Sequence, residues 1–509
     1  MCAPVPIVSN VTEIPMEYDF KDERGGLLMS LGTWLWVITI GFCLVFLVIS
    51  WKVRGKATSS YAEFVIGGGS LPFFLIFFTQ FATIMGVGNF VGHAASGAEV
   101  GLPHLFFVLG EQGSKIIFAL FFAGLAGKFT YKTVAEMIDD LFVRDQFTRM
   151  LMGIIASLIM IAWVGGQGKA FGYIFSVITG ANPTWIILFF SAVFILYTTL
   201  GGIYSVVWTD FVQGILVFLF GAVFYYYAFA PVDFSMAQLA QRLAETGHGG
   251  LWTISNVNTL SLITKFITGC IGILAAQIYW QRCFAAKDSH TARNGLLYSG
   301  IIAIVLVMLT ALVGMVIVAV NPGILSSDGK LVTDPMSWFL QSPYIPTFVA
   351  AMIFALILAA GMSSADSNLN SAATLIVNDF VLPLKRDATD KELVKYVTIA
   401  TVVIGVFAAL AALYASTIIG LFSRAYSIAG GALVPLLLVG LLWKKRPSEE
   451  FAMGTKNSNI TPWGARTGII VGGVLTQIQA LGANRNLIAL GVSALLIIVV
   501  SLMTKEHTK

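Results

Sequence analysis

Charged residues are scarce in this chain, and their scarcity excludes most soluble proteins. Only 11% of the 509 residues are Asp, Glu, Lys or Arg, whereas 57% are hydrophobic. Soluble domains contain about 25% charged residues. A soluble globule could not cover so much apolar surface, so the composition predicts a polytopic membrane protein. The formal net charge of +4 does not indicate a nucleic-acid partner, because the basic residues lie in short loops between apolar runs.

Three kinds of functional motif are also missing from the sequence. The four cysteines are scattered and predict no disulfide framework. No glycine-rich loop ends in Gly-Lys-Ser/Thr, so we do not expect ATP to supply energy directly. The five histidines lie mostly at loops or span ends and lack metal-ligand spacing. We therefore do not expect an enzyme.

Long apolar runs are what the chain does contain. Thirteen of them approach or exceed the roughly 20 residues that a helix needs to cross a bilayer, at 29–51, 71–93, 103–126, 147–178, 184–202, 204–229, 257–284, 294–320, 344–379, 394–416, 419–443, 465–483 and 487–504. The sequence thus predicts an all-α fold with one integral-membrane domain over residues 1–509. Residues 1–28 would form an external tail.

The basic residues predict the orientation of these spans. One set of alternate loops holds 21 Lys and Arg residues, and the opposite set holds 5. Cytoplasmic loops carry the excess of Lys and Arg. We therefore expect a multi-pass protein of the cell (inner) membrane, with its amino terminus outside and its carboxy terminus in the cytoplasm.

Glycines interrupt two predicted spans that lie five spans apart. Residues 84–92 read IMGVGNFVG, and residues 265–274 read KFITGCIGIL. Paired interruptions in corresponding positions favour an inverted repeat, in which broken helices meet at the binding site. The alternative is that these glycines only allow close helix packing.

One predicted span carries a dense polar cluster at its middle. Residues 350–379 are otherwise apolar but contain Ser363, Ser364, Asp366, Ser367, Asn368 and Asn370. Polar groups at that depth usually line an ion or substrate path. Hydroxyl and carboxylate oxygens suit a hard cation such as Na⁺. Serines that bond back to their own helix are the structural alternative.

Several strings resemble the sodium:solute symporter family between about residues 30 and 500. They are YAEFVIGGGSLP (61–72), YTTLGGIYSVVWTDFVQ (197–213), the polar string 363–371, LVGLLWKKR and GARTGIIVGG (464–473). The string at 197–213 is the most specific. The resemblance implies a LeuT-type core of five plus five inverted-repeat helices at 71–443. One extra helix (29–51) would precede the core, and two terminal helices (465–504) would follow it.

The resemblance also implies a sodium site between the first and eighth core helices. Backbone carbonyls would come from Ala82, Met85 and Ala360, and hydroxyls from Ser363 and Ser364. Helical spacing gives independent support, because positions 360, 363, 364 and 367 fall on one helix face.

Some relatives in that family hold a second sodium. The matching positions here are Asp210, Ser363, Ser367 and Asp366, the last of which is Ser in those relatives. Two neighbouring carboxylates do not both stay charged without a cation. Three alternatives remain at this point: a second cation, a carried proton, or an Asp366 that points away and pairs with a nearby Lys.

Five residues are candidate solute ligands. They are Asn89, Glu111, Lys169, Lys265 and Tyr426. A buried Lys would suit a carboxylate. The structural alternatives are that Glu111 pairs only with Lys115, that Lys265 extends toward an interface, and that Tyr426 packs between helices.

These observations predict a sodium-coupled symporter that imports a small organic solute by alternating access. A carboxylate or zwitterion is the expected cargo. A sodium/sugar symporter and a proton-coupled importer are the alternatives, and a transporter-like solute sensor is an alternative of another class. The expected partners are the solute, Na⁺ as co-substrate and the lipid bilayer, and we expect a monomer.

Overall fold

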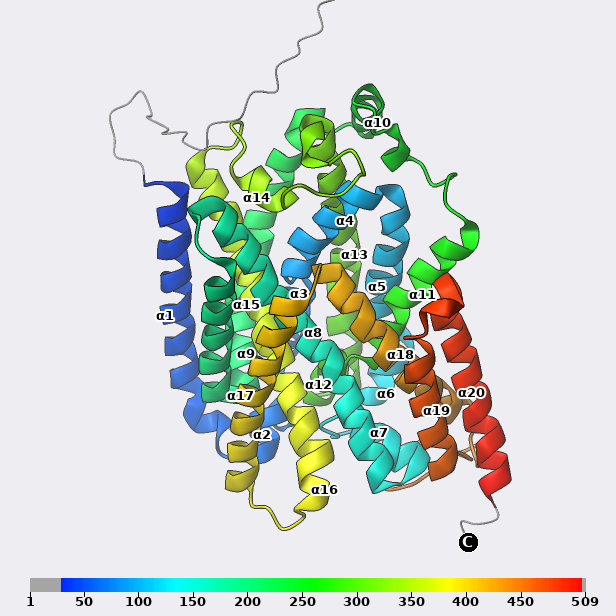
Figure 1. Ribbon diagram of the computed structural model, residues 1–509. Helices are drawn as coiled ribbons and strands as arrows, with labels where there is room; N and C mark the ends of the chain where they lie inside the picture. Colours follow the sequence, from blue (N-terminus) through cyan, green and yellow to red (C-terminus); the bar gives the residue numbers. More distant parts are fainter. Residues whose placement is uncertain (1–28, 506–509) are drawn as a thin grey trace, which may run out of the picture.

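The protein is an upright bundle of helices in a computed structural model that describes residues 29–505 (Figure 1). The predicted external tail, residues 1–28, lies outside the described residues. The described part contains no β-strand, only three isolated bridges. Its long helices are α1 (Leu31–Ala57), α5 (Leu105–Phe118), α8 (Gln146–Thr179), α9 (Pro183–Phe229), α13 (Ser289–Val320), α15 (Thr347–Ile376), α17 (Asp390–Tyr414), α18 (Ile418–Leu442), α19 (Pro462–Leu475) and α20 (Arg485–Thr504).

The described residues contain nine helices that are long and apolar enough to cross a membrane, or up to 11 if two bent helix pairs are each one span. Thirteen spans were predicted, and two features explain the difference. The predicted spans 184–202 and 204–229 lie in one helical run of 47 residues, α9, which joins two helices at the non-helical backbone of Gly202 (φ 48°, ψ −143°) and is counted once. At 1.5 Å per residue its 47 residues would suffice for two crossings. The predicted span 465–483 overlaps a helix of only 14 residues, α19.

The two bent pairs coincide with the two glycine-interrupted segments. α3 (Phe73–Ile84) and the segment Gly88–Val100, which contains α4 (His93–Val100), meet at 43°. α11 (Thr259–Ala275) and α12 (Gln277–Ala285) meet at 42°. Both members of the predicted pair are therefore broken helices.

Side chains satisfy the backbone groups that these breaks expose. In the first break the Gln167 side-chain oxygen accepts from Val87 N at 2.8 Å. In the second break the Trp280 indole donates to Leu274 O at 3.0 Å. Unpaired backbone groups are costly inside a membrane, so such partners are needed wherever a helix unwinds.

α15 lies at the centre of the bundle and is buried along almost its whole length. It packs chiefly against α9 and α8. Gly86 lets the first break approach α15 closely, because a Cβ at this position would lie 2.1 Å from Ser364 Oγ. By contrast, α1 exposes large apolar side chains such as Leu44 and Trp51 along one face, as a lipid-facing helix does.

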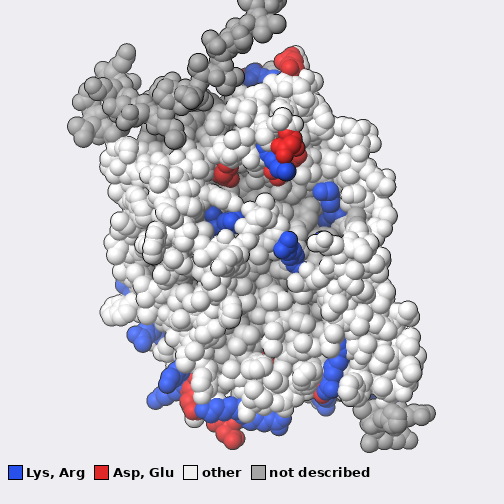
Figure 2. Space-filling view, in the orientation of Figure 1, with Lys and Arg blue, Asp and Glu red and all other residues white. Residues whose placement is uncertain are grey.

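Short helices cover the two ends of the bundle. α10 (Met236–Glu245) and α14 (Pro335–Leu340) lie at the upper end in Figure 1, and α2 (Tyr61–Ile66), α7 (Val134–Ile138) and α16 (Leu382–Leu384) lie at the lower end with α6 (Gly124–Ala126) above them. A nearly continuous band of Lys and Arg follows the lower end, with only scattered patches above it (Figure 2). Two ion pairs tie helices together at that end: Arg149 Nε–Asp379 Oδ1 at 2.9 Å and Arg466 Nη2–Asp145 Oδ2 at 2.7 Å.

Candidate ion and solute site

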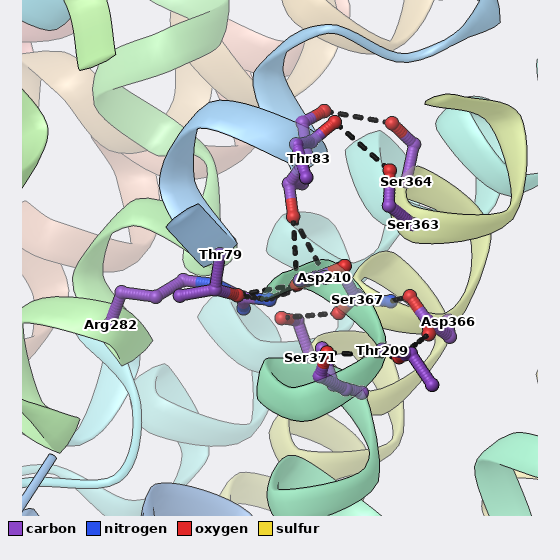
Figure 3. A network of polar contacts seen from close by, with 12 residues as sticks. Thr79, Thr83, Thr209, Asp210, Arg282, Ser363, Ser364, Asp366, Ser367 and Ser371 are labelled. Atoms are coloured by element: carbon purple, nitrogen blue, oxygen red, sulfur yellow. Dashed lines mark hydrogen bonds and ion pairs between the residues drawn. The ribbon is translucent and has the colours of Figure 1, made fainter. Parts of the chain in front are cut away.

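Five oxygen atoms of α3 and α15 converge beside the first break. Ser363 Oγ donates to Ala82 O and to Ala360 O, both at 2.9 Å. Ser364 Oγ donates to Thr83 O at 2.7 Å. Met85 ends α3 immediately after these residues. Figure 3 shows both serines facing the α3 carbonyls.

These contacts bear directly on the structural alternative for the serines. Ser363 bonds back within its own helix and also across to α3, whereas the printed bond of Ser364 is to α3 alone. A hydroxyl can rotate its proton away and offer lone pairs. The five oxygens could therefore pass from hydrogen bonding to the coordination of a hard cation.

A second polar group, which we call the ionic cluster, lies next to these oxygens and consists of Asp210, Arg282 and Asp366. All three residues are fully buried, and they come from α9, α12 and α15. Arg282 Nη2 lies 4.0 Å from Asp210 Oδ2 and donates to Ser367 Oγ at 2.5 Å. The cationic partner of Asp210 is therefore an arginine from the second broken helix.

Hydroxyl groups complete the surroundings of both carboxylates. Asp210 Oδ2 accepts from Thr79 at 2.5 Å and from Ser367 at 3.2 Å. Asp366 accepts from Ser367 N at 2.6 Å and from Thr209 Oγ1 at 3.2 Å. Ser367 thus contacts both carboxylates, and Figure 3 shows it between them.

A cavity lies beside the first break. Its lining consists of Thr83, Ile84, Gly86, Gly88, Asn89, Glu111, Gln112, Lys115, Trp163, Gln167, Tyr279, Ser364, Asn368 and Phe422. Thr83 and Ser364 belong both to this lining and to the oxygen group described above. An ion and a solute bound at the two places would therefore share residues.

Glu111 is the centre of a buried hydrogen-bond network at the cavity. Its Oε2 contacts His93 Nε2 at 3.0 Å and accepts from Gln112 Nε2 at 3.1 Å. Its Oε1 accepts from Tyr426 at 2.5 Å. Lys115 lies one turn along the same helix and donates to Gln112 Oε1 at 2.6 Å. The carboxylate and the ammonium group are thus linked through Gln112 and do not form a direct ion pair.

The predicted solute ligands fall into two groups in the structure. Asn89 and Glu111 line the cavity, whereas Tyr426 is not part of the lining and donates to Glu111. Lys169 and Lys265 are not part of the lining. The Lys169 ammonium donates to Ala412 O at 3.4 Å and lies 5.0 Å from the centre of the Tyr173 ring.

Sequence reasoning did not single out several residues of these sites. Three carry amide or guanidinium groups: Gln112, Gln167 and Arg282. Arg282 lies near the end of the predicted span 257–284 and was given no role, although its place next to the second glycine-interrupted segment was a usable signal. His93 was assigned to a span end, yet it is buried and contacts His104 Nε2 at 2.9 Å.

Comparison with known proteins finds relatives of this chain among membrane transporters. The protein is 27% identical over 493 residues to the osmoregulated proline transporter OpuE of Bacillus subtilis, covering 93% of this chain and 96% of that protein. It is 27% identical over 429 residues to a high-affinity choline transporter of Drosophila melanogaster, covering 80% of this chain and 66% of that protein. The match therefore spans just under two thirds of the Drosophila protein.

A solved structure shows the same fold. A Na⁺-coupled sialic acid symporter in a substrate-bound, outward-open state superposes with a TM-score of 0.75 at 19% identity, covering 92% of this chain and 97% of that one. The predicted LeuT-type, all-helical membrane fold is thereby confirmed. The model of the sodium:solute symporter family matches residues 64–454, which include both broken helices, α9 and α15. The chain belongs to the sodium:solute symporter family.

Proposed function

We propose that this protein imports a small zwitterionic solute together with Na⁺ by alternating access. The observation that carries the proposal is the shared boundary of the two sites. Thr83 and Ser364 line the cavity and also join the oxygen group at Ala82, Ala360 and Ser363. Na⁺ at that group would fix the shape of the cavity wall, and each ligand would raise the affinity of the other by the same factor.

The charges of the cavity favour a zwitterion over a simple carboxylate. Lys115 offers a compact positive charge to a carboxylate group. Glu111, which also lines the cavity, would repel a simple anion but would attract a cationic amine. Trp163, Tyr279 and Phe422 add aromatic faces, which attract quaternary and protonated amines. Proline and choline are the cargoes named for two relatives, and the first is a zwitterion.

The membrane orientation is part of the same proposal. The Lys and Arg residues at the lower end of Figure 2 support a cytoplasmic location of that end by the positive-inside rule. The cavity would then open to the outside when Na⁺ binds and to the cytoplasm when α3 and α12 move. The start of α3 and the end of α12 would move together, because Leu71 N donates to Ala285 O at 2.9 Å and Lys287 N donates to Leu71 O at 3.0 Å.

One Na⁺ per solute is energetically sufficient for such a carrier. Inward movement of one charge yields about 2.3 kcal/mol per 100 mV. A tenfold sodium gradient adds about 1.4 kcal/mol. The sum of about 3.7 kcal/mol supports accumulation of a solute without net charge by a few hundredfold at full coupling.

Uptake into proteoliposomes tests this function. The solute panel contains proline, choline, lactate and glucose, and an inward sodium gradient is compared with potassium and with a proton gradient alone. We expect concentrative uptake of the zwitterion under the sodium gradient only. Uptake driven by the proton gradient alone would contradict sodium coupling, and uptake of glucose or lactate in its place would contradict the proposed cargo.

A further inference from the structure

The ionic cluster contains its own cation at the position where a second Na⁺ would bind. The sequence predicted Asp210, Asp366 and Ser367 as ligands of a second cation or a proton. In the structure Arg282 Nη2 lies 2.5 Å from Ser367 Oγ, 3.4 Å from Thr79 Oγ1 and 4.0 Å from Asp210 Oδ2. A sodium ion that used these oxygens would lie against the guanidinium. Like charges repel strongly in such a dry interior.

The buried position of Arg282 shows that the guanidinium is held inside the protein. Its side chain is 0% exposed, as is that of Asp210. The side chain reaches the cluster from α12, the lower half of the second broken helix (Figure 3). A buried charge is stable only when opposite charge and hydrogen bonds compensate it. Asp210, Ser367 and Thr79 compensate Nη2, whereas Nε and Nη1 have no hydrogen-bond partner among the described residues.

Charge balance then indicates how many Na⁺ ions bind. With both carboxyls ionised, two carboxylates and one guanidinium leave the cluster with one net negative charge. The oxygens at Ala82, Thr83, Ala360, Ser363 and Ser364 are all uncharged carbonyl or hydroxyl groups. Thr83 joins the two groups, because its Oγ1 lies 2.9 Å from Ser367 Oγ and 3.5 Å from Asp210 Oδ2. One Na⁺ at the uncharged oxygens would make the whole region neutral.

We propose that Arg282 is a resident cation that replaces a second Na⁺, so that the carrier binds a single Na⁺ in each transport cycle. Asp366 then has a defined role. Without the Asp366 carboxylate, the charges of Arg282 and Asp210 would cancel. The Na⁺ at Ser363 would then have no neighbouring negative charge. This role depends on the proposed function, because the single Na⁺ would bind at Ser363 and Ser364.

Equilibrium binding of radioactive sodium to the purified, full-length protein tests this role and needs no knowledge of the solute. We expect one saturable Na⁺ per wild-type chain. In Arg282→Gln two carboxylates remain without a buried cation, so we expect two Na⁺ per chain. In Asp366→Ser we expect binding at least tenfold weaker than in the wild type. The double variant Arg282→Gln, Asp366→Ser recovers one net negative charge, and we expect it to bind one Na⁺ with near wild-type affinity.

Controls keep the outcome decisive if one variant does not fold. Arg282→Lys keeps the positive charge, and we expect it to bind one Na⁺. If Arg282→Gln does not fold, the affinity of Asp366→Ser decides alone. Two Na⁺ per wild-type chain, or unchanged affinity in Asp366→Ser, would overturn the role of Arg282. Sodium binding that persists in Ser363→Ala would instead contradict the proposed sodium site, so the two failures are distinguishable.

Discussion

Two buried charged groups near the first broken helix differ in how their charges are compensated. In the ionic cluster Asp210, Arg282 and Asp366 come from three helices and compensate one another within the protein. At the cavity Glu111 and Lys115 come from one helix, α5, and both line an open space. The charges of the first group are compensated by residues of the group itself, whereas the charges of the second group are available to a ligand in the cavity.

This difference indicates a division of labour between ion and solute recognition. Charges that are compensated within the protein set how many ions the carrier needs. Charges that face the cavity set which solute it accepts. Substitutions in the cavity should therefore change solute affinity, and substitutions in the ionic cluster should change sodium binding.

The largest expected effect is on the cavity side. Glu111→Ala removes the acceptor of Tyr426 and Gln112 and the partner of His93. Leaving such buried groups unsatisfied costs about 1–3 kcal/mol each. We therefore expect solute uptake to fall at least ~100-fold, a cost of about 3 kcal/mol. Sodium binding in the absence of solute should change less than about twofold. A large loss of sodium affinity in this variant would contradict the separation of solute recognition from sodium binding.

A smaller effect is expected for the neighbouring ammonium group. Lys115→Met keeps most of the side-chain volume but removes the positive charge. Loss of a charged contact costs about 1.5–3 kcal/mol, so we expect solute affinity to fall roughly 10–100-fold for a zwitterion. The matching amide or ester of that solute should be transported equally by both proteins. Competition assays with such a pair of compounds measure this, and equal losses for both compounds would contradict a carboxylate contact at Lys115.

Thr83 tests how the two regions communicate, because it belongs to both. Thr83→Val is nearly isosteric but removes the hydroxyl that contacts Ser367 and Asp210. Coupling free energies between sites are commonly about 1–3 kcal/mol. We expect the increase in sodium affinity caused by solute to shrink by roughly tenfold in this variant. Sodium titrations with and without solute provide the measurement. If the solute raises sodium affinity as much in this variant as in the wild type, Thr83 does not carry the coupling between the two sites.

The smallest expected effect concerns a buried carboxyl that has no cation partner. Asp334 caps α14 and accepts from Ser337 N at 2.7 Å and from Ser337 Oγ at 2.8 Å. No ion pair of Asp334 occurs in the described residues. Burial raises its pKa to about 6. Folding thus favours the protonated form, and that stabilisation is lost as the pH rises from about 4 through 6.

Asp334→Asn keeps an acceptor at the cap without an ionisable group. Relative to this variant, the wild type should lose thermal stability as the pH rises from 4.5 to 7.5. Melting temperatures of the two proteins in detergent, measured across that range, provide the check. If the melting temperatures of the two proteins changed with pH in the same way, the ionisation of Asp334 would not affect the stability of the fold.

The two regions also differ in how much of them could be predicted from the sequence. The broken helices were predicted because glycines mark both breaks at residues 84–92 and 265–274. The sodium site was predicted from the family resemblance, and the helix face that Ser363 and Ser364 share with Ala360 gave independent support. The glycines and the shared helix face are local patterns, and local patterns are visible in one sequence.

Contacts between distant segments were not predictable in the same way. Arg282 is 72 residues from Asp210 and 84 from Asp366, and no periodicity links it to either of them. His93 and Glu111 meet because the chain reverses at Gly101 between α4 and α5. The break at Gly202, by contrast, falls between the predicted spans 184–202 and 204–229, where a glycine with φ 48° joins two helices without a loop.

Sodium binding to the purified protein is the most direct test of the central claim, which places Na⁺ between the end of α3 and Ser363 and Ser364. Calorimetric titration of the wild type with NaCl should give a saturable heat at one ion per chain, and titration with KCl should give none. The double variant Ser363→Ala, Ser364→Ala should lose the sodium heat while its melting temperature stays within a few degrees. A double variant that still binds Na⁺ with wild-type affinity would contradict the account.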